Sequence, residues 1–194
     1  MQNAVIVRWS LAALILSIPI LSPVLTHAQS VSGSARAVQA TVVTPTGLST
    51  STLADTGTLS GPTDARDASQ PSGSVDSLIT AETLHATTIG STDQVASEAS
   101  VAGLAVEIAG TSISAGFAQA RATTGNKGVW SATVHDLSIN GVPIDASGAR
   151  NQTIAIPGGS IVINEQTGSV VNALHIVING VADVVIASAS ANAQ

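Results

Sequence analysis

Cysteine is absent from this 194-residue chain, and aromatic residues are nearly absent. Without cysteine there is no disulfide, no thiolate metal site, no thiol nucleophile and no lipid-modified cysteine anchor. The chain has no Tyr, one Phe (Phe117) and two Trp (Trp9 and Trp130). Sugar-binding surfaces commonly stack rings on Trp or Tyr, so this composition weighs against a carbohydrate platform.

Charged residues are also scarce, at 9% of the chain, and the acidic ones dominate. Twelve Asp and Glu stand against six Lys and Arg, which gives a formal net charge of −6 at pH 7. Because binding to nucleic acid phosphates needs clustered Lys and Arg, we expect no nucleic acid among the partners.

The first 28 residues have the three parts of a secretory signal peptide. Arg8 is basic, an apolar run extends from Leu11 to Leu21, and small residues up to Ala28 follow Pro23. The run is shorter than the ~20 residues of a membrane-spanning helix. We therefore predict cleavage after Ala28 and no transmembrane segment in the mature chain, which would be secreted or held at the cell surface.

The rest of the chain divides by composition into three segments. Residues 29–43 contain an alternating stretch that predicts a first strand. Residues 44–73 are rich in Ser, Thr, Gly and Pro and predict a loop or linker. Residues 74–194 hold short Val, Ile, Thr and Ala runs separated by Gly, Asn or Pro, which is typical of an all-β domain.

The pair Asn179-Gly180 lies between two apolar runs and predicts a C-terminal antiparallel hairpin. Asn and Gly tolerate the positive φ angles of a type I′ turn, the tight turn that joins paired strands. A second such pair, Asn140-Gly141, follows the run "VHDLSI".

One pattern, Val-x-x-Leu-x-Val/Ile, occurs three times, beginning at Val101, Val134 and Val171. In a regular strand, residues three apart point to opposite faces, so a bulge or bend is expected between the Val and the Leu. Strands that bend in this way fit a sandwich in which strands pass from one sheet to the other at corners. The predicted fold class is thus all-β, an antiparallel β-sandwich with a C-terminal hairpin, with a β-solenoid as the alternative.

The C-terminal half also resembles a known family. "DLSINGVPI" (136–144), "NQTIAIPGGSIVINEQ" (151–166) and "VNALHIVINGVADVVIASASA" (171–191) are similar, in sequence and order, to the closing region of the choice-of-anchor P family of exported bacterial proteins. The resemblance covers about residues 74–191. It implies a surface or secreted domain and brings no catalytic residues. The polar ending "SASANAQ" has no sorting motif or hydrophobic tail, so we expect a soluble protein or non-covalent attachment.

Two sets of residues invite a catalytic or metal hypothesis. His135 and Asp136 lie near Ser131 and Ser138 and suggest a Ser-His-Asp hydrolase, although no Gly-x-Ser-x-Gly elbow occurs. The metal candidates are as follows: His85, His135, His175 and Glu165. These histidines are 50 and 40 residues apart, unlike the short spacings of most zinc sites, and no cofactor is expected.

Glu165 and His175 have a structural explanation as well. His175 alternates with Leu174 and Ile176 and should lie on the opposite face of its strand. Asn164, Glu165 and Gln166 would form a polar clamp that holds the last hairpin.

Together these observations predict a non-enzymatic domain that is structural or that binds other surface or extracellular proteins. The alternative is an extracellular hydrolase or metal-dependent enzyme that uses His135, Asp136 and His175.

Overall fold

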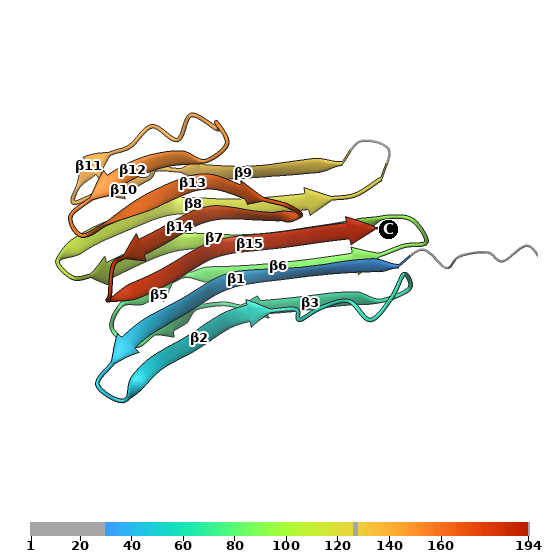
Figure 1. The fold of residues 1–194 in the computed structure, drawn as a ribbon, viewed down its shortest axis with the longest axis horizontal. Coiled ribbons are helices and arrows are strands. Elements are labelled where there is room, and N and C mark those ends of the chain that lie inside the picture. The colour runs from blue at the N-terminus through green and yellow to red at the C-terminus, as the bar shows by residue number, and fades with distance from the viewer. Residues whose placement is uncertain (1–29, 126–127, 194) are drawn as a thin grey trace, which may run out of the picture.

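The chain folds into two antiparallel β-sheets packed face to face, which confirms the predicted sandwich rather than the solenoid (Figure 1). This computed structural model describes residues 30–125 and 128–193, where it contains strands and no helix. The predicted signal peptide, residues 1–28, lies outside the described residues.

Sheet A is built from both ends of the described chain, because β1 pairs with β15. Its strand order is β12-β13-β14-β15-β1-β2. Its strands are β1 (Val31–Thr44), β2 (Gly47–Asp55), β12 (Gln152–Ile156), β13 (Gly159–Thr167), β14 (Val170–Ile178) and β15 (Ala182–Ala193).

Sheet B contains the strands between these two groups. Long strands β7 and β8 pair at its centre, β6 and β5 pair successive parts of β7, and β9 and β10 pair successive parts of β8. Its strands are β3 (Ala65–Gln70), β4 (Gly73–Val75), β5 (Ile79–Ala81), β6 (Thr83–Gly90), β7 (Val95–Ile108), β8 (Thr111–Thr123), β9 (Val129–His135), β10 (Ser138–Ile139) and β11 (Val142–Pro143).

The segment predicted to be a loop, residues 44–73, instead contains two strands, β2 and β3. The prediction was wrong because β2 lies at the edge of sheet A and exposes most of its residues, so no apolar period marks it. The predicted first strand is confirmed as β1.

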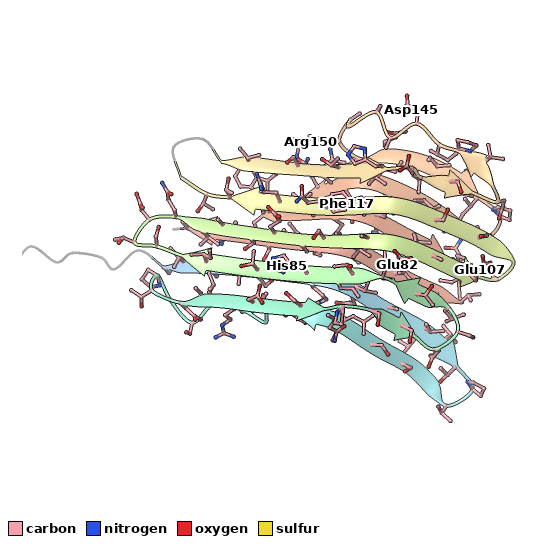
Figure 2. All side chains as sticks on the ribbon, turned by 180° about the vertical axis from the view of Figure 1, so that it is seen from behind. Glu82, His85, Glu107, Phe117, Asp145 and Arg150 are labelled. Carbon is pink, nitrogen blue, oxygen red and sulfur yellow. The ribbon has the colours of Figure 1, made fainter. Side chains whose placement is uncertain are left out.

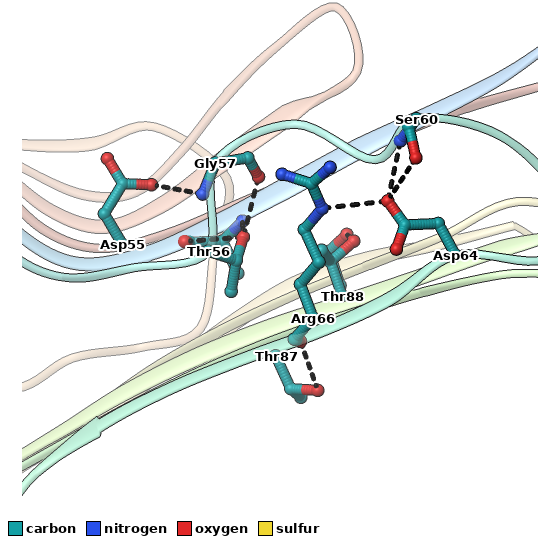
Figure 3. Close-up of polar contacts among 10 residues, drawn as sticks. Asp55, Thr56, Gly57, Ser60, Asp64, Arg66, Thr87 and Thr88 are labelled. Carbon is teal, nitrogen blue, oxygen red and sulfur yellow. Dashed lines mark hydrogen bonds and ion pairs between the residues drawn. The ribbon is translucent and has the colours of Figure 1, made fainter.

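Residues 56–64 connect β2 of sheet A to β3 of sheet B (Figure 3), and residues 144–151 connect β11 of sheet B back to β12 of sheet A. Asp64 Oδ2 accepts hydrogen bonds of 2.8 Å from the backbone N and the Oγ of Ser60 and from Arg66 Nε. The backbone hydrogen bond from Ser60 and the contact with Arg66 lower the pKa of Asp64 to about 2. These polar bonds hold the connection together with the packing of Leu59, which is buried in the core.

The bends predicted from the repeated Val-x-x-Leu pattern are present. Gly103 (φ 59°) and Asp136 (φ 54°) have left-handed backbone in the first two copies. In the third, the residues opposite Ala173 on the two neighbouring strands are left-handed: Asn164 (φ 50°) and Ala187 (φ 49°). Pairing continues without an added residue. The bent strands also stay in their own sheet, so the expectation of corners between sheets was wrong.

The bends divide the core into two halves whose buried side chains differ in size. On one side Ile, Leu and Val fill the space between the sheets, for example Leu104, Leu174 and Ile186. On the other side the buried residues are mostly small: Ala35, Ala99, Ala118, Ala120, Ala122, Ala187, Ala189 and Ala191. A Cβ on Gly33 of β1 would come 2.4 Å from Val95 Cγ1 on β7, so the sheets approach closely here.

The C-terminal hairpin is confirmed, since β14 pairs with β15 from Ile178↔Ala182 onward. The turn type differs from the predicted one. Of the pair Asn179-Gly180, only Gly180 has positive φ (71°), because a three-residue connection does not require two left-handed residues. At Asn140-Gly141, which directly joins β10 to β11, both φ angles are positive (50° and 75°), as in a type I′ turn.

Candidate functional site

Glu165, His175 and Asp183 form a connected polar group on the outer face of sheet A. The ring of His175 on β14 lies between two carboxylates: Nδ1 is 2.9 Å from Glu165 Oε1 on β13, and Nε2 is 3.1 Å from Asp183 Oδ1 on β15. Asn172 donates a 2.6 Å hydrogen bond from Nδ2 to Glu165 Oε2. Leu174 and Ile176 are buried, so His175 faces outward as its alternation predicts.

The two carboxylates favour the protonated form of His175. Partial burial of the ring lowers its pKa, but the hydrogen bond and charge of Glu165 and those of Asp183 outweigh this effect, and the pKa is raised above 6.5. A doubly protonated ring donates to both carboxylates at once. In that state it has no free lone pair with which to bind a metal or take a proton from a substrate.

This group joins three adjacent strands and so forms a clamp over the last hairpin. Asn164 and Gln166 bond other parts of the chain: Asn164 Nδ2 donates to the Gly148 carbonyl, and Gln166 Nε2 donates to the Trp130 carbonyl of β9, both at 2.9 Å. All three residues 164–166 lie within β13. Of the three residues predicted to hold the last hairpin, Glu165 alone bonds it through its side chain, and Asp183 is a further member of the clamp.

The predicted hydrolase residues are not brought together. His135 lies at the end of β9 in sheet B, stacked on Phe117 with ring centroids 6.3 Å apart, whereas His175 lies on the outer face of sheet A. Asp136 occupies a left-handed bend position. Ser138 Oγ is engaged at 3.0 Å by Ser114 Oγ. The combination of His135, Asp136 and His175 proposed from the sequence is therefore not assembled.

His85, a metal candidate, lies on β6 beside two residues of β3, and Figure 2 labels it on the outer face of sheet B. Its Nδ1 is 2.8 Å from Ser69 Oγ and 3.4 Å from Asp67 Oδ2. In a catalytic triad the carboxylate and the hydroxyl bind opposite ring nitrogens. Here both approach the same nitrogen, so this exposed cluster lacks the triad arrangement.

The described ranges contain no assembled metal site. Over residues 30–125 and 128–193, no three His, Asp or Glu side chains are placed so that they could hold an ion.

A hollow of about 500 Å³ opens between β9 of sheet B and β13 of sheet A. Its lining includes Trp130, Arg150, Asn164 and Gln166. Trp130 is 37% exposed, and Figure 2 labels Arg150 in the segment between β11 and β12. No motif in the sequence marks this site, although Trp130 is the one Trp outside the predicted leader.

Comparison with known proteins finds no relative: no family model, no curated protein and no solved structure matches the chain. In the part of the chain that the structure describes, no helical segment has the length and apolarity that a bilayer crossing requires.

Proposed function

We propose that this protein is an exported, non-enzymatic β domain that acts by binding other polypeptides outside the cell or at its surface. The observation that carries the proposal is the hollow between β9 and β13, which combines an exposed Trp130 with Arg150 beside the edge of a sheet. Trp and Arg are the residue types that contribute most at protein interfaces.

The chemistry of the histidines supports a binding domain over an enzyme. Both nitrogens of His175 face carboxylates, whereas His135 stacks on Phe117 and, among the described residues, has no hydrogen bond to a carboxylate or a hydroxyl. A general base must reach the proton that it removes. The His175 clamp uses both of its nitrogens within the protein, which supports a structural role for Glu165 and His175.

Export rests on the leader and on the family resemblance. The basic, apolar and small-residue parts of residues 1–28, together with the similarity of residues 74–191 to the choice-of-anchor P family, support a secreted or surface-attached protein. When the full chain is expressed in a bacterium, mass spectrometry of the exported product should show a chain that begins at Gln29. An intact Met1 with retention in the membrane would contradict export.

The non-enzymatic part has its own test. Chromogenic esters, phosphate esters and peptides would be incubated with the exported protein from pH 5 to 9, with and without zinc. We expect hydrolysis no faster than in buffer, and no difference between the wild type and its His175→Gln and Ser69→Ala variants. Turnover that is lost in one of these variants would overturn the proposal and favour the hydrolase.

A further inference from the structure

The strand β9 offers one unpaired edge to the hollow. Within the described residues it pairs only with β8. The Trp130 carbonyl accepts a hydrogen bond from Gln166 Nε2 at 2.9 Å, so it points away from β8. Since backbone groups alternate in direction along a strand, Ala132 and Val134 direct their N–H and C=O groups to the same side.

Free space runs along this edge. The hollow of about 500 Å³ at Trp130 shares Ala132 and Gly148 with a second hollow of about 200 Å³, which continues past Val134 to His135. Together they follow the part of β9 whose edge groups point outward. An extended chain needs this kind of space to add itself to a sheet by main-chain hydrogen bonds.

The charge of the hollow comes from Arg150. Arg36, Arg66 and Arg121 form ion pairs with Asp55, Asp64 and Glu98. Among the described residues no ion pair joins Arg150, although the whole chain has an excess of acidic residues. A free guanidinium beside a groove is suited to a carboxylate, which it can bind with two parallel hydrogen bonds.

Trp130 adds an apolar surface at the same place. Gly128 makes room for its ring, since a Cβ on Gly128 would come 2.4 Å from the indole Cη2. The indole therefore lies against the start of its own strand and exposes part of its ring to the hollow.

We infer that β9 binds an extended segment of a partner polypeptide as an added antiparallel or parallel strand, with an Asp or Glu of the segment on Arg150 and an apolar side chain against Trp130. This inference rests on the proposed binding function and specifies its partner class and site. An acidic strand fits better than a basic one because Arg150 is the basic residue that lines the hollow.

The test uses a displayed library of random heptapeptides, selected on the exported protein. We expect the selected peptides to share one Asp or Glu in an otherwise β-prone sequence. Binding should change the fluorescence of Trp130, the one indole left after leader removal. Arg150→Gln should weaken binding about tenfold, as loss of a charge pair does. In that variant, Glu→Gln in the peptide should cause no further loss.

A second variant tests the strand itself. Ala132→Pro removes an N–H that points away from β8, and edge strands tolerate proline at such positions. We expect it to fold, by circular dichroism, and to lose peptide binding. If this variant does not fold, Arg150→Gln with the Glu and Gln peptides still decides the outcome.

Three results would overturn the inference. Selected peptides that bind both variants as tightly as the wild type would place the site elsewhere and leave the binding function standing. A library with no enrichment over empty support would remove the peptide site, while the turnover assay still judges the proposed function separately. Self-association that Ala132→Pro abolishes would show that the occupant is a second copy of this chain.

Discussion

Glu165 Oε1 lies 2.9 Å from His175 Nδ1, and the two residues come from adjacent strands of sheet A, β13 and β14. The side chains of both residues are 22% exposed, so solvent screens their interaction only in part. Their contact, extended to Asp183, ties β13, β14 and β15 together.

The first prediction removes the charge of Glu165 while keeping its shape. Glu165→Gln should lower the free energy of unfolding by about 0.5–2 kcal/mol at pH 6, because the protonated His175 loses a charged acceptor. Urea denaturation measures this difference. Asp67→Asn is the matched control: Asp67 also contacts a histidine but is 62% exposed, and its loss should cost less than about 0.5 kcal/mol. Equal midpoints for Glu165→Gln and wild type would show that the clamp contributes nothing.

The second prediction concerns pH. The pKa of His175 is higher in the folded protein than its ordinary value of 6.5. Protonation therefore stabilises the fold, fully below pH 6.5, and this stability is lost as pH rises through the folded pKa. The difference in unfolding free energy between wild type and His175→Gln should shrink between pH 6 and 8. A difference that stays constant over this range would show that the pKa of His175 is the same in the folded and the unfolded protein.

The third prediction tests the last turn. Gly180 has φ of 71° and open space around it, so Gly180→Val introduces backbone strain without a clash and should destabilise the protein by about 1–3 kcal/mol. Gly61 is the control, since it also has open space but no positive φ. Gly61→Val should change the denaturation midpoint little. If both valines cost the same, the strain at Gly180 is not the cause.

The fold was largely predictable because strand periodicity and turn residues act locally. In the repeated pattern a Val comes three residues before a Leu, as at Val101, Val134 and Val171. Both side chains can face the core only if the backbone bends between them, and the bends lie at these places. Strand β2 was not predictable, because an edge strand with Ser and Thr on both faces has no apolar period. The turn at Gly180 was predicted at the correct place, but its type was predicted wrongly. The number of residues in the turn depends on where β14 and β15 begin to pair, which the sequence does not show.

The candidate site was predictable in part. Glu165 and His175 stand out as polar residues in an apolar run, and the hairpin around Gly180 places Asp183 diagonally from His175, within reach of a long side chain. The hollow at Trp130 was not predictable, because Arg150 comes from a segment without regular structure. Its position beside β9 depends on how the two sheets pack at their open side.

If both ring nitrogens of His175 serve the clamp, this residue is neither a base nor a metal ligand. A titration of its ring nitrogens by ¹⁵N nuclear magnetic resonance on the exported protein tests this most directly. We expect the doubly protonated ring to predominate at pH 6, its pKa to lie above 6.5 and to fall in Glu165→Gln, and one equivalent of zinc to leave the signals unchanged. A neutral ring at pH 6, or a ring nitrogen whose signal shifts on binding zinc, would contradict this expectation.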